Sequence, residues 1–187
     1  MTISTVDQST ALIVIDLQRG IVAMPTAHNV TDVVNNSVAL ANAFREKGLP
    51  VIWVNVDAGA PGRTEQTSPR QNPPADWADL IPELNVRPSD LHVTKKQWGA
   101  FTNTPLFDAL TGLGVTQVVI AGLMTTKGVE STARSAHELG FHVTLAVDAM
   151  SDTNLAAHEN SVANIFPQLG ETGTTSEILN LLESRGA

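Results

Sequence analysis

Ala11-Leu-Ile-Val-Ile-Asp16 is a run of five apolar residues that ends on a single carboxylate. A short, continuous apolar run rich in β-branched residues is typical of a strand buried on both faces, as in the middle of a parallel sheet. Downstream, apolar residues recur at helical spacing over residues 30–47, and Pro50-Val-Ile-Trp-Val-Asn-Val56 has the composition of another strand. A strand, a helix and a strand with short connections predict one right-handed βαβ unit.

The same alternation continues along the chain. Patterns typical of strands occur at 91–94, 117–122 and 141–147, and helical patterns occur at 105–113, 126–139, 155–166 and 175–183. They predict an α/β protein with a mainly parallel, doubly wound sheet and helices on both faces, a Rossmann-like three-layer α/β/α architecture. Since 187 residues suffice for one full core, we expect a single domain over residues 1–187.

Residues 57–90 interrupt this alternation. They contain eight proline and glycine residues and only short apolar patches. A long excursion of this kind inside a compact domain is usually functional, so we expect residues 57–90 to form a lid or binding loop.

Composition excludes several classes of function. Cysteine is absent, which rules out disulfide bonds, cysteine-ligated metals and a thiol nucleophile. Nineteen acidic residues against 11 basic ones give a net charge of −8, and without a basic patch we expect neither a nucleic-acid nor a membrane partner. The chain has no N-terminal signal core and no apolar run near the roughly 20 residues of a membrane span, which favours the cytoplasm.

Several cofactor motifs are also missing. The five histidines are scattered without HxH or HxxxH spacing, so no metal site is expected, and His137 and His158 are interpreted as exposed helix residues. The sequence has no GxGxxG, Walker or GxSxG motif, so dinucleotide, ATP and α/β-hydrolase sites are not supported. We therefore predict no cofactor and a small molecule as the partner.

The strand ends carry the candidate chemistry. In open parallel sheets ligands bind beyond the carboxyl ends of the strands, where Asp16, Lys95 and the turn 122–128 are expected. An Asp and a Lys at neighbouring strand ends can act as an acid/base pair, although a capped helix and a surface salt bridge would give the same pattern. The turn leads into a helix, whose free N–H groups suit an anionic oxygen.

Four stretches, in this order and spacing, carry a family resemblance. They are Ala11-Leu-Ile-Val-Ile-Asp16-Leu-Gln18, Thr94-Lys95-Lys-Gln-Trp98-Gly-Ala-Phe101, Val118-Val-Ile-Ala-Gly122-Leu-Met-Thr-Thr-Lys-Gly128-Val-Glu-Ser-Thr132-Ala133 and Asp148-Ala149. Together they resemble the isochorismatase-like hydrolase superfamily, which includes isochorismatases, nicotinamidases and related amidohydrolases. The resemblance runs from about residue 11 to residue 175.

The resemblance implies roles for three residues. The family places an Asp after the first strand and a Lys after the third, which Asp16 and Lys95 match, and Lys95 is preferred over Lys96 by its spacing to Phe101. Most members have a cysteine where this chain has Gly128, so the acyl-enzyme route of the amidases is removed. Isochorismatases proper carry Gly there, and their Asp is thought to protonate a vinyl ether so that water adds and pyruvate leaves.

The resemblance also implies a substrate environment. Backbone N–H groups of Met124 and Gly128 would bind an anionic oxygen, and a cis peptide is expected at Leu123–Met124. The predicted substrate-binding residues are Gln18, Arg63, Trp98, Phe101, Met124 and Thr125. A homo-oligomer is expected from the family.

Three alternatives remain open at this stage. The chain can be a hydrolase in which Asp16 activates water directly against another substrate. It can be a catalytically silent relative that binds a small molecule or serves assembly. Gly128 can also be an engineered replacement of a natural cysteine.

Overall fold

Six parallel strands form one sheet in the order β3-β2-β1-β4-β5-β6, with the apolar run at its centre as β1 (Thr10–Ile15). The other strands are β2 (Val51–Val56), β3 (Leu91–Lys95), β4 (Gln117–Leu123), β5 (His142–Ser151) and β6 (Glu171–Gly173). The computed structural model describes residues 3–57, 59–60, 62–65 and 73–184. Because the strand order reverses between β1 and β4, the carboxyl ends of these two strands flank the switch point at which such sheets bind ligands.

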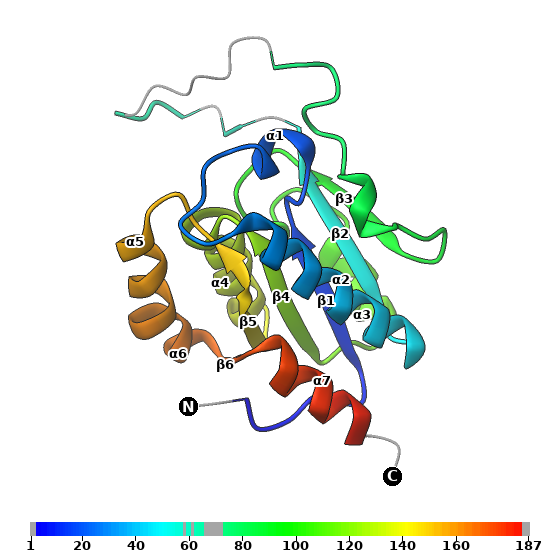
Figure 1. Cartoon of the computed structure of the whole chain (residues 1–187). Coiled ribbons are helices and arrows are strands. Elements are labelled where there is room, and N and C mark those ends of the chain that lie inside the picture. The colour runs from blue at the N-terminus through cyan, green and yellow to red at the C-terminus, as the bar shows by residue number, and fades with distance from the viewer. Residues whose placement is uncertain (1–2, 58, 61, 66–72, 185–187) are drawn as a thin grey trace.

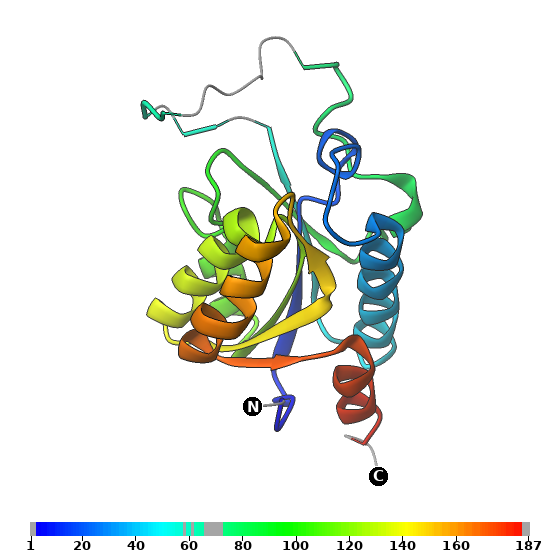
Figure 2. The ribbon, with the colours of Figure 1, turned by 60° about the vertical axis from the view of Figure 1, so that its left-hand side comes forward.

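Helices cover both faces of the sheet, so the predicted three-layer architecture is confirmed (Figures 1 and 2). On one face lie α2 (Val30–Glu46) and α7 (Thr175–Ser184), whose buried residues belong to the same core as Leu12 and Val14 of β1. On the other face α3 (Leu106–Gly112), α4 (Glu130–Glu138) and α6 (Phe166–Leu169) pack against Ala11, Ile13 and Ile15. Alternate residues of β1 thus enter two separate cores, which is why the strand has no polar face.

The remaining short elements are α1 (Arg19–Val22), η1 (Pro82–Leu84), η2 (Thr125–Val129), α5 (Leu155–Asn160) and η3 (Ser161–Ile165). Both η2 and η3 are single π-helical turns, so the helices predicted at 126–139 and 155–166 each contain a wider turn. Within the ranges given above, no helix has the length and apolar character needed to cross a bilayer.

Two strands differ from the sequence prediction. β6 was not predicted, because Glu171-Thr-Gly173 has no apolar pattern; it is held by pairing with β5 and by Ser4, which donates to the Glu171 carboxylate. β5 extends beyond the predicted 141–147, since a register shift in the pairing of β4 with β5 lets Met150 and Ser151 continue the ladder. Asp148 therefore lies within β5, where its carboxylate accepts from the first residue of α7.

A buried ion pair fastens the end of the 57–90 excursion to the sheet. Asp90 precedes β3, and its side chain is 2% exposed and accepts from the Arg45 guanidinium of α2 and from Trp53 Nε1 of β2. Burial by itself raises the pKa of the Asp90 carboxyl, but hydrogen bonds from Arg45, the Arg87 backbone N–H and Trp53 outweigh it, so this pKa lies below its ordinary value.

Removing this carboxylate should destabilise the fold. Asp90→Ala leaves the Arg45 charge buried without its partner, and we expect a loss of about 3–5 kcal/mol in the free energy of unfolding, measured by urea denaturation at pH 7. A lowered folded-state pKa also means that this stabilisation is present above the ordinary Asp pKa and is lost as the pH falls through the folded value. The cost of Asp90→Ala should therefore shrink below pH 4; a cost that does not depend on pH would contradict the assignment.

Candidate active site

Asp16 stands at the carboxyl end of β1 in a left-handed backbone conformation, with φ at 53°. Its N–H continues the sheet by donating to the Val54 carbonyl at 2.8 Å, and the residue is only 5% exposed. Asp is one of the few non-glycine residues that tolerate this conformation, and such backbone outliers gather at active sites. The turn places the carboxylate beyond the carboxyl end of β1, on neither face of the sheet.

Lys95 ends β3 and forms a buried ion pair with Asp16. Its Nζ lies 2.8 Å from Asp16 Oδ2 and 3.2 Å from the Gln97 carbonyl, and its side chain is 1% exposed. Lys96 is exposed, so the spacing to Phe101 selected the lysine that is buried at the carboxyl end of the sheet. Two charges withdrawn from water in this way are costly unless they are paired closely, which is the condition met here.

The turn after β4 reaches Asp16 because Gly122 allows a close approach between the backbones of β4 and β1. Gly122 has φ at 107°, and a Cβ there would lie 2.1 Å from the Ile15 carbonyl oxygen. The next peptide, Leu123–Met124, is cis, as the family resemblance implied. The chain then enters the π turn η2 and continues as α4, so the positive N-terminal end of this helix lies over the carboxylate.

The side-chain direction of residue 128 points toward the Asp16 carboxylate. A Cβ at this position would lie 3.2 Å from Asp16 Oδ2 and 2.7 Å from Ile15 Cγ2. Residue 128 therefore faces the acid, as the nucleophile position of the family should, but the space for a side chain is filled by the Ile15 methyl group.

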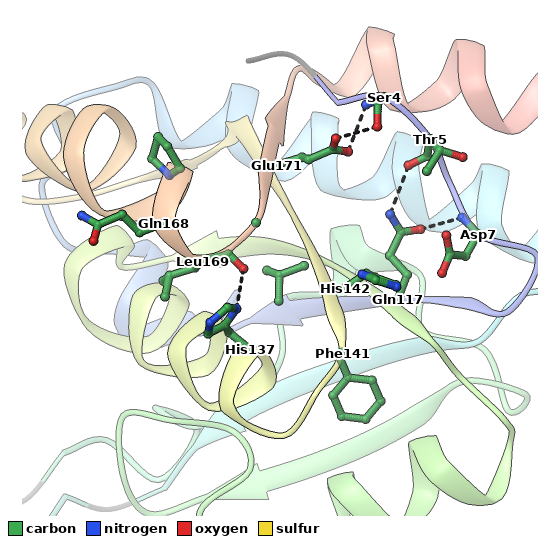
Figure 3. Close-up of a pocket in the computed structure, with 13 residues that line it drawn as sticks. Ser4, Thr5, Asp7, Gln117, His137, Phe141, His142, Gln168, Leu169 and Glu171 are labelled. Atoms are coloured by element: carbon green, nitrogen blue, oxygen red, sulfur yellow. Dashed lines mark hydrogen bonds between the residues drawn. The ribbon is translucent and has the colours of Figure 1, made fainter.

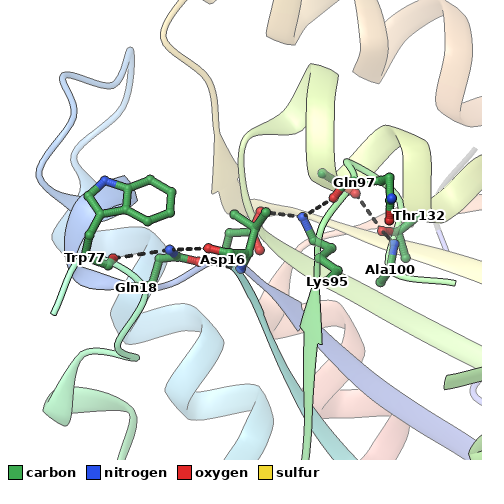
Figure 4. A network of polar contacts seen from close by, with 9 residues as sticks. Asp16, Gln18, Trp77, Lys95, Gln97, Ala100 and Thr132 are labelled. Atoms are coloured by element: carbon green, nitrogen blue, oxygen red, sulfur yellow. Dashed lines mark hydrogen bonds and ion pairs between the residues drawn. The ribbon is translucent and has the colours of Figure 1, made fainter. Parts of the chain in front are cut away.

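One network holds the two sides of the site together (Figure 4). Thr132, one turn after Gly128, donates to the Gly128 carbonyl at 2.6 Å and accepts from Ala100 N–H at 3.1 Å. Lys95 binds the same 96–101 loop through the Gln97 carbonyl. The loop that carries Lys95 and the turn that carries Gly128 are thus fixed to one another.

Gln18 and Trp77 close the opposite side (Figure 4). The Gln18 amide donates to the carbonyls of Val56 and Trp77 and accepts from Val56 N–H. The Trp77 indole lies so close to Gly20 that a Cβ there would meet it at 1.9 Å. Gln18 is fully buried. Its hydrogen bond to the Trp77 carbonyl joins the 57–90 segment to the end of β1.

The other predicted substrate-binding residues are dispersed. Phe101 is buried and stacks on Phe141 at 5.9 Å, while Trp98 is 58% exposed. Met124 and Thr125 are buried in the turn, and the Thr125 hydroxyl lies 2.8 Å from His158 Nδ1. Arg63 is exposed, and no hydrogen bond or ion pair within the described residues joins it to Asp16 or Lys95. The part of the excursion at 58, 61 and 66–72 lies outside the described residues.

Sequence reasoning missed a polar cluster beside the turn. His158 was expected to be exposed on a helix, which is wrong: it is 7% exposed and contacts His28 and Thr125. Asp152, which follows β5 directly, is also buried and accepts from the N–H and hydroxyl of Thr126. The position of Asp152 after a strand was a usable signal, whereas nothing in the helical pattern of 155–166 distinguishes the buried His158.

One cavity is remote from this chemistry. It measures about 510 Å³ and lies at the amino ends of β4, β5 and β6, lined by residues that include Gln117, His142 and Glu171 (Figure 3). A second cavity, of about 430 Å³, lies beside Asn55 and His92. Neither includes Asp16 or Lys95, so position at the sheet edge, not cavity size, identifies the candidate active site.

Comparison with known proteins agrees with this geometry. Residues 10–177 match the isochorismatase domain. The chain belongs to the isochorismatase family. It is 41% identical to the isochorismatase family protein YwoC of Bacillus subtilis, over 92% of this chain and 93% of that protein. The structure of an isochorismatase family protein from Burkholderia thailandensis superposes with a TM-score of 0.93 at 39% identity, covering 97% of this chain and all of that one.

A more distant relative points to variation in activity within the family. The chain is 30% identical to a probable inactive nicotinamidase of Arabidopsis thaliana, over 85% of this chain and 87% of that protein. Family membership therefore establishes an isochorismatase-family hydrolase fold and leaves the reaction to be argued from the site.

The ion pair can be tested by a double-mutant cycle. Lys95→Met leaves the Asp16 carboxylate buried without its cation, and we expect a loss of about 3–5 kcal/mol in the free energy of unfolding. The double variant Asp16→Asn/Lys95→Met removes both charges and should recover much of that loss. Lys96→Met is the matched control and should change stability by less than about 0.5 kcal/mol. Equal costs for the two lysines would contradict a buried pair.

The packing around Gly128 makes a second prediction. Gly128→Ala drives a methyl group into Ile15 Cγ2 and should cost about 1–3 kcal/mol, measured by thermal or urea unfolding. The cost should be smaller in an Ile15→Ala background, which removes the contacting methyl group. Gly112→Ala, where a Cβ meets nothing within 4 Å, is the control and should be neutral or stabilising. The same cost in both backgrounds would show that Ile15 does not set the limit.

Proposed function

We propose that this protein hydrolyses a small, carboxylated or ether-bearing molecule by acid/base chemistry without a covalent nucleophile. The observation that carries the proposal is the buried Asp16–Lys95 ion pair beside Gly128, where a Cβ would lie 3.2 Å from Asp16 Oδ2. A carboxyl group and a fixed cation lie there, at the carboxyl end of the sheet near the point where the strand order reverses.

In the proposed reaction Asp16 is the general acid. Once protonated, the Asp16 carboxyl transfers this proton to the terminal carbon of a vinyl ether. Water adds to the cationic carbon that results and gives up one proton to the Asp16 carboxylate. The hemiketal then collapses to pyruvate and an alcohol. Lys95 stabilises the carboxylate left after proton transfer, and the backbone N–H groups of Met124 and Gly128 bind an anionic oxygen of the substrate.

Amidase chemistry is not proposed. In the cysteine-bearing branch of the family a thiolate attacks the amide carbon, and this chain has no cysteine at all. At residue 128 the methyl group of Ile15 also occupies the space that a nucleophilic side chain would need. A direct attack of water, with Asp16 as general base, is the remaining hydrolytic route on another substrate.

A catalytically silent binding protein is the second candidate. The similarity to a probable inactive nicotinamidase favours it. On this reading the Asp16–Lys95 pair has a structural role only. A homo-oligomer in the cytoplasm stays a prediction under either function.

A pyruvate-release assay with isochorismate separates these candidates. We expect turnover by the unmodified chain, at least a 100-fold loss in Asp16→Asn, and a loss in Lys95→Ala, since each removes a group that acts in the transition state. Lys96→Ala, which changes an exposed neighbour, should retain full activity. Turnover that survives Asp16→Asn would refute the acid assignment. No turnover at high enzyme concentration would remove the vinyl-ether reaction and leave direct hydrolysis of another substrate or the silent candidate.

A further inference from the structure

Three segments distant in sequence bring two histidines to the back of the turn at Met124. His28 precedes α2, Ser151 ends β5, and His158 lies in α5. Ser151 Oγ accepts from the His28 N–H at 3.1 Å and lies 3.0 Å from His28 Nδ1. The His28 and His158 rings meet edge to face with centroids 4.7 Å apart, and His158 Nδ1 lies 2.8 Å from Thr125 Oγ1.

The direction of the hydrogen bond between Thr125 and His158 depends on which ring nitrogen of His158 carries the proton. Thr125 is fully buried, and its hydroxyl has one hydrogen to donate. In the tautomer with the proton on Nε2, neutral His158 accepts that hydrogen at Nδ1. Burial first, and then the charge of His28, lower the pKa of His158 from its ordinary value of 6.5, so the neutral acceptor form prevails at pH 7.

This contact fixes the segment on which the active site depends. Thr125 begins η2, and the Met124 carbonyl next to it accepts from the N–H groups of Lys127 and Val129, which flank Gly128. Asp152 holds the following residue, Thr126, through both its N–H and its hydroxyl. The β5–α5 segment therefore holds the turn through two side chains, the Asp152 carboxylate and the His158 imidazole.

We propose that His158 is a positioning residue for the Met124–Gly128 turn. As a neutral acceptor for Thr125 it sets the position of the Met124 and Gly128 backbone N–H groups, and protonation of His158 displaces them. This role rests on the proposed function, because the N–H groups matter to catalysis only if they bind substrate oxygen.

The groups around His158 decide the sign of its pH dependence. His28 faces it from the loop before α2 and opposes its protonation, whereas Asp152 after β5 and Glu159 on α5 favour it. Burial and His28 together prevail, so the folded protein binds this proton less readily than the unfolded chain does. The contribution of neutral His158 is therefore complete above pH 6.5 and is lost as the pH falls below that value.

Two amide substitutions test whether Thr125 needs a hydrogen-bond acceptor at the position of Nδ1 or only a polar side chain. His158→Asn places an amide oxygen near the position of Nδ1, and His158→Gln places its amide near Nε2 instead. His142→Gln, a change at an exposed histidine of β5, is the matched control.

Backbone NMR of Gly128 provides a readout that needs no substrate. In the unmodified chain we expect the Gly128 amide shift to follow a single titration with a midpoint below pH 6.5. His158→Asn should abolish the titration and keep the neutral-pH shift, His158→Gln should abolish it and displace the shift, and His142→Gln should leave both unchanged. A Gly128 amide that does not titrate, or that titrates equally in His158→Gln, would overturn the proposal. If His158→Gln does not fold, the unmodified chain and His158→Asn decide the question.

Pyruvate release measures how the same variants affect catalysis. We expect a roughly tenfold lower kcat with an unchanged KM for His158→Gln at pH 7.5, since the displaced N–H groups act mainly on the transition state. His158→Asn should stay within about twofold of the unmodified chain, and its activity should no longer follow the histidine titration. Equal activity of the Asn and Gln variants would overturn the positioning role. If no variant releases pyruvate while the NMR result holds, the substrate assignment has failed and the positioning of the turn stands.

Discussion

The arrangement of this protein depends on a carboxylate and an ammonium group that are buried together at one edge of the sheet. Asp16 and Lys95 are separated by 79 positions, and their side chains meet at 2.8 Å with almost no contact with water. Such a pair is tolerated only where its geometry is held closely, because either charge alone would be costly. The surrounding structure supplies that geometry: parallel strands bring both residues to one edge, and the 96–101 loop binds Lys95 from the other side.

Backbone proximity is the second constraint on the site. Gly122 lets β4 pass close to β1, and Gly128 lets the following helix approach the carboxylate without a side chain between them. The helix end and the ion pair are therefore adjacent, which brings a carboxylate, a cation and the positive end of a helix together. The same proximity limits the chemistry, since the Ile15 methyl group fills the space in which most family members would carry a nucleophile.

Anchors outside the site hold its parts in position. The Gln18 amide and the Trp77 indole dock the excursion on the end of β1, and the Arg45–Asp90 pair fastens its other end to α2. On the far side of the turn, His158 and Asp152 hold Thr125 and Thr126. Each anchor joins segments that are far apart in sequence, so a change at any of them can act on Asp16 or Gly128 without touching a substrate.

The sequence by itself determined the alternating α/β architecture and the central strand, because apolar periodicity is a local property of the chain. The spacing of the family motifs selected Asp16, Lys95 and Gly128 as candidate site residues. Family spacing also determined the position of the cis peptide. Only the tertiary structure decided that Gln18 binds the carbonyls of Val56 and Trp77, that Trp98 is exposed, and that His158 is buried beside Thr125. Those outcomes depend on contacts between distant segments, and neither residue type nor helical period specifies which segment packs against a given side chain.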